Sequence, residues 1–363
     1  METKPSEISS GKMFGGYNKR FKHFSPTLGC SMNFHIYFPP SPSPSHKFPV
    51  LYFLAGLTCT DENFIFKSGA QRVAAAEGIA LVTPDTSPRG LNVEGEADSW
   101  DFGVGLKWFF GRLLALPFPI TQKNNAKLDQ KVLELRTAQM AAQFYGSALL
   151  NIKLHLILFG HGGENEGTDL RRAGFYLNAT QEKWKNWRMY DYVVKELPKL
   201  LSDNFPQLET SKASIFGHSM GGHVNVAEQY SANKRKIFSG KENVEGKMSV
   251  SAFAPITNPI NCPWGQKAFP NYLGDNKSEW EEYDATCLVT KFPNVSSSIL
   301  IDQGEDDQFF PYQLLPHNFE EACRKANVPL LLRFHPGYDH GYYFIATFVD
   351  DHIRHHAQAL RLN

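Results

Sequence analysis

Residues 217–221 read Gly-His-Ser-Met-Gly, a G-x-S-x-G pattern whose central serine is Ser219. The apolar run 213–216 before the motif predicts a strand, and residues 223–228 after it are compatible with a helix. A serine on a tight strand-to-helix turn projects its hydroxyl from the edge of a sheet, and the flanking glycines admit the close backbone approach. Ser219 is therefore a candidate nucleophile, and the α/β-hydrolase fold is the first expectation.

A serine hydroxyl needs a base to take its proton and an acid to orient that base. In this fold the chain order is Ser, then Asp or Glu, then His. The apolar run 298–301 is followed by Asp302, Asp306 and Asp307. Asp302 lies at the strand end and is more typical of a structural residue, whereas spacing does not separate Asp306 from Asp307.

The base is expected after the predicted strand 330–334. His340 follows this strand by a short loop, as the base of such a site should. His335 is the rival, but it lies at the strand end itself and precedes a proline.

The tetrahedral intermediate of acyl transfer also needs two backbone N–H donors. One is expected from Met220, the residue after the nucleophile. The other is expected from a loop after an early strand, and Leu57, next to Gly56 and after the apolar run 50–54, fits that position. A second candidate loop is Gly-His-Gly-Gly at 160–163, which follows the apolar run 154–159.

Beyond these residues, the chain resembles the S-formylglutathione hydrolase family, also called esterase D. The resemblance runs from about residue 7 to the C-terminus and implies a triad of Ser219, Asp307 and His340, with oxyanion donors at Leu57 and Met220. It implies one α/β-hydrolase domain with a mostly parallel sheet and helices on both faces. The matching stretches are 56–60, 67–70, 84–90, 98–103, 187–190, 217–223, 251–255, 262–265, 300–304, 337–340 and 342–345.

The reaction implied by the resemblance is hydrolysis of the thioester S-formylglutathione to glutathione and formate, without a metal or organic cofactor. A formyl group is small, so the acyl pocket should be narrow, with Trp264 and Phe309 as candidate walls. Cys59, in the expected oxyanion loop, is a small packing residue or a thiol whose modification blocks the site. Arg89 and Lys267 are candidates for contacts with the carboxylates of glutathione.

The chain departs from the family pattern at residues 106–172, which we interpret as an insertion into the hydrolase domain. Three hypotheses compete for it: a retained or mispredicted coding segment without evolved structure, a lid or interaction module, or the source of the alternative oxyanion loop. Loop closure entropy grows slowly with length, so the fold tolerates such a segment more easily than access to the site does.

Composition limits the other possibilities. The chain has 363 residues, a formal net charge of zero, 42% hydrophobic and 20% charged residues, which fits one globular domain and argues against electrostatic capture of nucleic acid. Five cysteines predict a reducing compartment without a disulfide framework, and no apolar run is long enough for a membrane span. We expect a cytoplasmic enzyme, and the resemblance suggests a homodimer. The alternatives are a general short-chain carboxylesterase, or a catalytically impaired interaction protein.

Overall fold

The structure of the protein is a computed structural model. It describes residues 4–89, 91, 174–223, 227, 249–292 and 299–361. The expected insertion at about 106–172 and the alternative oxyanion loop at 160–163 lie outside the described residues.

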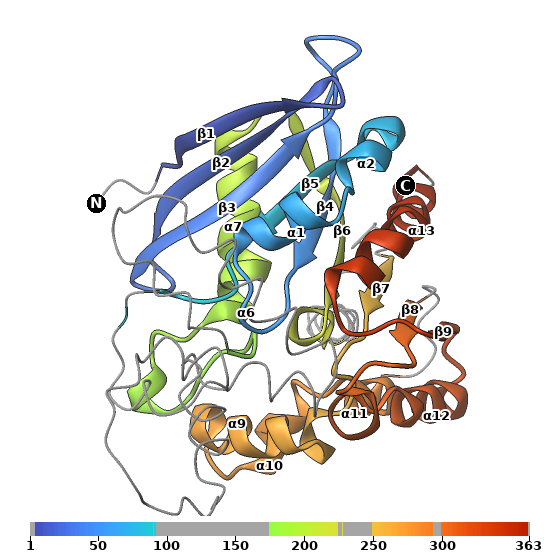
Figure 1. Ribbon diagram of the computed structural model, residues 1–363. Coiled ribbons are helices and arrows are strands. Elements are labelled where there is room, and N and C mark those ends of the chain that lie inside the picture. Colours follow the sequence, from blue (N-terminus) through green and yellow to red (C-terminus); the bar gives the residue numbers. More distant parts are fainter. Residues whose placement is uncertain are drawn as a thin grey trace, which may run out of the picture. The chain divides into compact units, whose positions relative to one another are not determined.

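The described residues form a nine-stranded sheet in the order β1-β2-β3-β5-β4-β6-β7-β8-β9 (Figure 1). The first three strands and β5 are paired antiparallel, whereas β5, β4, β6, β7, β8 and β9 pair in parallel. The predicted α/β-hydrolase class, with a mostly parallel sheet, is confirmed. The strands are β1 (Ser6–Met13), β2 (Gly16–Ser25), β3 (Cys30–Phe38), β4 (Phe48–Leu54), β5 (Ala80–Pro84), β6 (Leu208–His218), β7 (Val250–Phe253), β8 (Ile299–Gly304) and β9 (Leu330–His335).

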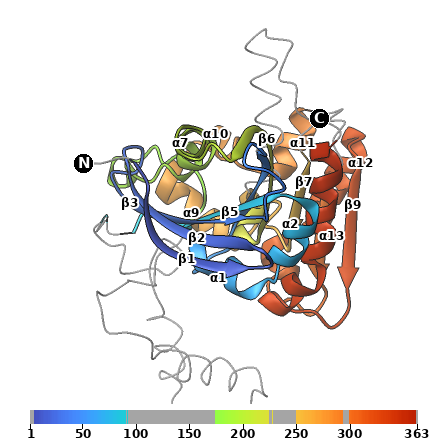
Figure 2. The same ribbon diagram turned by 90° about the horizontal axis from the view of Figure 1, so that it is seen from above.

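Helices cover both faces of this sheet, with α1, α2 and α13 on one face and α7 and α11 on the other (Figure 2). A central parallel sheet must be covered in this way, because its strands are apolar on both faces. The helical segments are α1 (Asp61–Lys67), α2 (Gln71–Glu77), η3 (Glu182–Trp184), α6 (Met189–Asp191), η4 (Tyr192–Glu196), α7 (Leu197–Asn204), η5 (Pro259–Asn261), α9 (Pro263–Leu273), α10 (Lys277–Glu281), α11 (Ala285–Lys291), η6 (Phe310–Leu314), α12 (Pro316–Ala326) and α13 (Tyr342–Arg361).

Successive side chains of β7 point to opposite faces of the sheet and contact different helices. Val250 and Ala252 pack in the apolar cluster that contains residues of α11 and α12. Ser251, between them, points to the opposite face, where its hydroxyl contacts His352 and His356 of α13 at 2.7 and 2.9 Å. Both histidines are buried, and hydrogen bonds to the sheet satisfy their ring nitrogens.

The N-terminal edge of the sheet was only partly predictable. The hairpin of β2 and β3 follows from its alternating apolar residues. Strand β1 reads Ser-Glu-Ile-Ser-Ser-Gly-Lys-Met and is almost entirely exposed. It has no apolar face that would predict a strand, and it owes its place to backbone pairing with β2.

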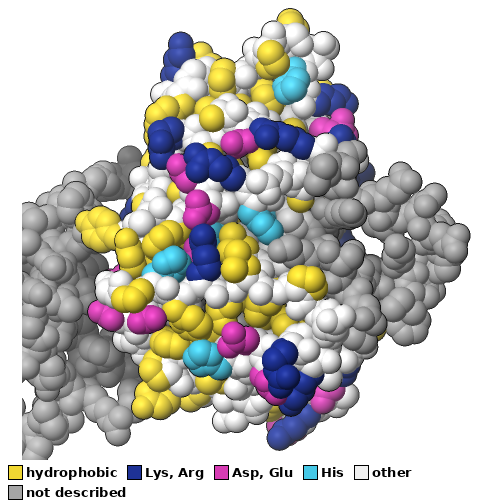
Figure 3. Space-filling view, turned by 90° about the vertical axis from the view of Figure 1, so that its right-hand side faces the viewer, with side chains coloured by type: hydrophobic (Ala, Val, Ile, Leu, Met, Phe, Trp, Pro, Cys, Tyr) yellow, Lys and Arg dark blue, Asp and Glu magenta, His cyan; other side chains and the backbone are white. Residues whose placement is uncertain are grey.

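Three further features of the described chain bear on its class. None of its helices combines the length and apolar character that crossing a bilayer requires. All five cysteines are free. On the face shown in Figure 3, which is seen from the side of α12 and α13, basic side chains lie beside acidic ones. Charges of both signs are therefore mixed on this face.

Helix α1 offers a matched test of the core. The Phe64 ring stacks on Phe53 at 3.6 Å between centroids and meets Phe216 edge-on at 5.5 Å, whereas Phe66 is 67% exposed. Phe64→Ala should lower the free energy of unfolding by about 3–5 kcal/mol, because it leaves a cavity in the core. Phe66→Ala should change it by less than about 0.5 kcal/mol. Urea unfolding measures both, and equal losses would contradict this account of the core.

Candidate functional site

Ser219 lies on a sharp turn between a strand and a helix. Strand β6 ends at His218, and helical structure begins at Met220. Ser219 itself has φ 55°, in the left-handed region that non-glycine residues rarely adopt. A Cβ atom at Gly221 would come within 2.0 Å of the Leu54 carbonyl oxygen, so the glycine of the motif is required by close backbone approach.

The backbone around Ser219 is fixed by hydrogen bonds to its neighbours. Its N–H donates to the carbonyl of Phe253, at the end of β7, at 2.9 Å. Its carbonyl accepts from the N–H groups of His223 and Ile256 at 3.1 and 3.2 Å. These bonds to two separate segments hold the unfavourable φ in place.

The structure distinguishes the two aspartates that spacing left open. Asp307 is buried, and its Oδ2 lies 2.5 Å from His340 Nδ1, whereas Asp306 is exposed. Asp307 Oδ1 accepts from the Phe309 N–H at 2.8 Å, and Gln303 Nε2 donates to Oδ2 at 3.3 Å. An ionised carboxylate only accepts, so Nδ1 of His340 carries the proton and Nε2 is the basic nitrogen.

The alternative candidates, Asp302 for the acid and His335 for the base, contact other residues. Asp302 accepts two hydrogen bonds of 2.6 Å from Arg333 and a third, of 3.1 Å, from His352. His335 has Nε2 3.2 Å from Asp302, and its ring stacks on Phe348 at 3.8 Å between centroids. Both residues belong to an ion-pair cluster between β8, β9 and α13, so Asp302 has the structural role that the sequence suggested, although it lies within β8 and not at its end.

Aromatic rings connect His340 with the predicted substrate residues. The centroid of His340 is 4.4 Å from that of His218, the residue before Ser219, and 5.0 Å from that of Phe309. Phe309 in turn contacts Trp264 at 4.9 Å. The structure therefore brings Trp264 and Phe309 together beside His340.

The sequence pattern did not single out His218, which is buried within this group. Burial and the neighbouring His340 hold the pKa of His218 well below its usual value, although the His340 backbone opposes the shift. His218 is therefore neutral at pH 7 and adds no positive charge beside His340. Its burial was the missing signal, and the motif alone does not reveal it.

The loop with Leu57 lies against the turn that carries Ser219. A Cβ atom at Gly56 would lie 3.1 Å from Ser219 Cβ and 3.0 Å from His218 Nδ1. Within the described residues, neither Leu57 nor Met220 donates its N–H to a backbone carbonyl. Both N–H groups are thus available to an acceptor at this edge of the sheet.

Cys59 follows in the same loop. It is half-buried, and burial raises the pKa of its thiol although Tyr342, Lys67 and Arg89 oppose the shift. The Tyr342 hydroxyl donates to Cys59 Sγ at 3.8 Å. This thiol is therefore protonated at pH 7 and has little nucleophilic character.

No group of three or more His, Cys, Asp or Glu side chains with the geometry of a metal site occurs in the part of the chain that the structure describes. The chemistry available here is that of a serine hydroxyl, a histidine with an orienting carboxylate, and backbone N–H donors.

Comparison with known proteins agrees with this geometry. The Esterase family model matches residues 25–112 and 134–355. The chain belongs to the esterase family. It is 61% identical to S-formylglutathione hydrolase of Arabidopsis thaliana, and 43% identical to that of Rattus norvegicus, with 98% of each chain covered in both cases.

Two solved structures of S-formylglutathione hydrolases are similar to this esterase. An S-formylglutathione hydrolase from Agrobacterium tumefaciens matches with a TM-score of 0.70 and 33% identity, over 98% of this chain and 99% of that one. An S-formylglutathione hydrolase from Staphylococcus aureus matches with a TM-score of 0.53 at 15% identity, over 93% and 97%, and shares the fold. The predicted family and hydrolase class are thereby confirmed.

The strained turn of this esterase generates a first prediction. Ser219→Gly and Ser219→Ala both remove the hydroxyl, but only glycine relieves the positive φ. The glycine variant should be more stable to urea by about 1 kcal/mol. At Ser214, which lies in β6 without a positive φ, the alanine variant should be the more stable of the two. An alanine variant at 219 as stable as the glycine variant would contradict the strained turn.

The burial of His223, in the helix that follows Ser219, predicts that the stability of the fold depends on pH. Burial lowers its pKa to about 4, opposed by its hydrogen bond to the Ile256 carbonyl. Its unfolded pKa is about 6.5, so the unfolded state binds the proton first, and stability falls as pH drops from about 6.5 towards 4.

Between pH 7 and pH 5, the free energy of unfolding in urea should therefore fall by about 2 kcal/mol less in His223→Gln than in the wild type. His317→Gln, at a side chain that is 64% exposed, is the control and should follow the wild type. Parallel pH profiles for His223→Gln and the wild type would rule out a buried neutral His223.

Proposed function

We propose that this esterase hydrolyses S-formylglutathione to glutathione and formate, with Ser219 as nucleophile, His340 as base and Asp307 as the acid that orients the base. The observation that carries the proposal is the hydrogen bond between buried Asp307 and half-buried His340, whose ring contacts His218 immediately before Ser219. The 61% identity to an S-formylglutathione hydrolase supports the choice of substrate.

In the first half of the reaction, Ser219 Oγ attacks the formyl carbon while His340 Nε2 takes the hydroxyl proton. The carbonyl oxygen becomes an oxyanion, which the N–H groups of Leu57 and Met220 stabilise. The C–S bond then breaks, and His340 returns its proton to the glutathione thiolate. Asp307 stabilises the imidazolium that forms between these two proton transfers.

In the second half, a water molecule gives a proton to His340 Nε2 and attacks the formyl ester on Ser219. The C–O bond to Ser219 breaks, the serine recovers its proton from His340, and formic acid leaves and ionises to formate. The water supplies both the oxygen and the proton that the products need, so neither half requires a metal or an organic cofactor.

The rings beside His340 favour a small acyl group. We assign Trp264 and Phe309 to the walls of the substrate pocket, because they form one continuous row with His340. We assign Cys59 to the same pocket because it lies two residues after Leu57. Its protonated thiol fits a packing role near the substrate better than a second nucleophile.

Three broader expectations stand as proposals. The five free cysteines support a cytoplasmic enzyme, and the mixed surface charge supports a small-molecule substrate without nucleic acid or membrane. A homodimer remains a proposal. Residues 106–172 are proposed to be an insertion in one hydrolase domain, which is supported in part by residues 113–133, because they lie between the two segments that the family model matches.

The test is S-formylglutathione hydrolysis by the full-length chain and by point variants. Ser219→Ala should lower kcat roughly 10⁴-fold or more, and Asp307→Asn roughly 10³- to 10⁴-fold, because the asparagine favours the wrong His340 tautomer. Asp306→Asn, at the exposed neighbour, is the matched control and should keep wild-type kcat. Loss of activity in the Asp306 variant with retention in the Asp307 variant would overturn the assignment.

The substrate is tested separately by comparing kcat/KM for S-formylglutathione with that for 4-nitrophenyl acetate. A much larger value for the thioester supports the proposed substrate. Equal values would indicate a general short-chain carboxylesterase instead. If activity appears only after deletion of residues 106–172, the full-length chain is the catalytically impaired form.

A further inference from the structure

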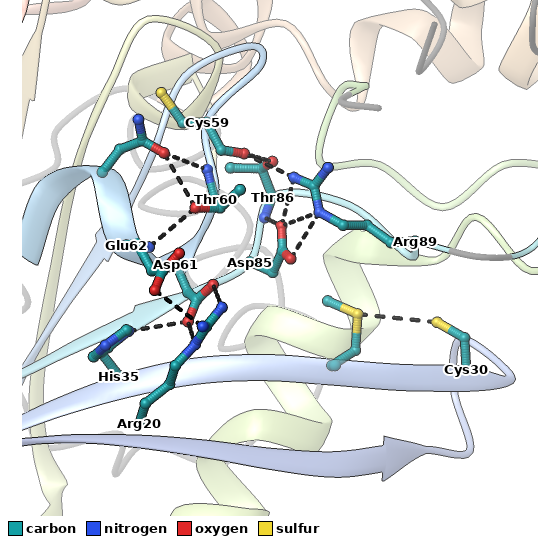
Figure 4. A network of polar contacts seen from close by, with 12 residues as sticks. Arg20, Cys30, His35, Cys59, Thr60, Asp61, Glu62, Asp85, Thr86 and Arg89 are labelled. Atoms are coloured by element: carbon teal, nitrogen blue, oxygen red, sulfur yellow. Dashed lines mark hydrogen bonds and ion pairs between the residues drawn. The ribbon is translucent and has the colours of Figure 1, made fainter. Parts of the chain in front are cut away.

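We propose that Arg89 is a positioning residue of this esterase, which holds the loop of the Leu57 N–H donor in its active geometry through the carbonyl of Cys59. This inference rests on the oxyanion role proposed above for Leu57. Figure 4 shows Arg89 and Asp85 lying together beside Thr86 and the Cys59 backbone.

The loop at 55–60 contains an unfavourable backbone conformation. Thr58 has φ 67°, and the Cys59 N–H donates to the Gly56 carbonyl at 3.3 Å, which closes a tight turn around Leu57 and Thr58. A left-handed residue other than glycine costs about 1–3 kcal/mol and persists where its surroundings enforce it. The turn that presents the Leu57 N–H therefore needs external contacts.

Three side chains from other segments donate hydrogen bonds to carbonyl groups beside this turn. The Cys59 carbonyl accepts from Arg89 Nη2 at 3.0 Å and from the Thr86 hydroxyl. The Tyr176 hydroxyl donates to the Ala55 carbonyl at 3.3 Å. The carbonyls before and after the turn are thus held by donors from other segments of the chain.

The guanidinium of Arg89 is also held by Asp85. Its Nε lies 2.8 Å from Asp85 Oδ2, and its Nη2 lies 2.9 Å from Asp85 Oδ1. Asp85 is buried at 4% exposure and also accepts from the Thr86 N–H at 2.7 Å. A planar guanidinium can bind a carboxylate with two nitrogens and still donate to a carbonyl, which a lysine ammonium cannot reproduce.

The C-terminal end of the loop is anchored separately. Thr60 caps helix α1 in a reciprocal capping box with Asn63. Asp61, fully buried, accepts from Arg20 at 2.8 and 3.0 Å and lies 3.0 Å from His35 Nδ1 (Figure 4). These contacts hold α1 against β2 and β3. The hydrogen bond from Arg89 to the Cys59 carbonyl therefore acts on the turn and not on the position of α1.

Arg89 was also a candidate for a glutathione carboxylate. Its guanidinium faces Asp85 and the Cys59 carbonyl, so it acts on the reaction through the backbone of the loop. A misplaced N–H donor weakens stabilisation of the oxyanion, which exists only after attack, and leaves ground-state binding of the substrate almost unchanged.

The experiment compares the wild type with Arg89→Met and Arg89→Lys on S-formylglutathione and 4-nitrophenyl acetate. Arg89→Met should lower kcat about tenfold or more on both substrates, with KM changed less than about threefold. Arg89→Lys should regain thermal stability, because it restores the charge beside Asp85, but should not regain kcat.

Arg333→Met is the matched control, since it removes an equally close bidentate pair with a buried aspartate, Asp302, away from the loop. It should lower the thermal midpoint while keeping kcat near the wild-type value. Wild-type kcat in Arg89→Met, or an equal loss of kcat in Arg333→Met, would overturn the proposal.

If Arg89→Met does not fold, as judged by circular dichroism, Arg89→Lys decides by the same criterion. Native circular dichroism with reduced kcat supports the positioning role, and wild-type kcat overturns it. A wild-type chain that hydrolyses neither substrate would contradict the proposed function itself. That failure is therefore distinct from the failure of Arg89 alone.

Discussion

The left-handed backbone of Ser219 is the constraint on which the arrangement of the site depends. A residue with a Cβ atom stays at φ 55° only because β6, the close approach of Gly221 to β4, and the hydrogen bond to Phe253 leave no relaxed alternative. The turn places the serine at the edge of the sheet, and the next N–H, that of Met220, lies at the start of a helix and donates to no backbone carbonyl among the described residues. The proposed nucleophile and one proposed oxyanion donor are therefore set by one local conformation.

Three of the six non-glycine residues with a positive φ in the described part of the chain lie at one edge of the sheet. Thr58 follows β4, Ser219 follows β6, and Ala254, with φ 42°, follows β7. The carboxyl ends of parallel strands meet at the same edge, where an open α/β sheet binds its ligands. Two of these residues are held by neighbouring strands, since the N–H groups of Ser219 and Ala254 donate to the carbonyls of Phe253 and Asp302. The rigid sheet compensates for unfavourable turns, and those turns carry the backbone groups that we propose to face the substrate.

Much of this site could be predicted from sequence, because its signals are local. The motif around Ser219 and the position of His340 after a strand are read within a few residues. The choice between Asp306 and Asp307 depends on which side chain points inward, and adjacent loop residues do not reveal that; only the resemblance to a known family selected Asp307. Strand β1 has no apolar alternation, and the contacts of Arg89 with Cys59 join segments thirty residues apart. Such long-range pairing carries no local pattern, so it required the structure.

The most direct measurement of the central claim is mass spectrometry of the full-length chain after reaction with a fluorophosphonate. Such a reagent forms a stable adduct only with a serine whose hydroxyl is activated by a base and whose oxyanion is stabilised. The account predicts one adduct per chain, on the peptide that contains Ser219, and a strongly slowed reaction in Asp307→Asn. An adduct on a different serine, or none on a folded chain, would contradict it.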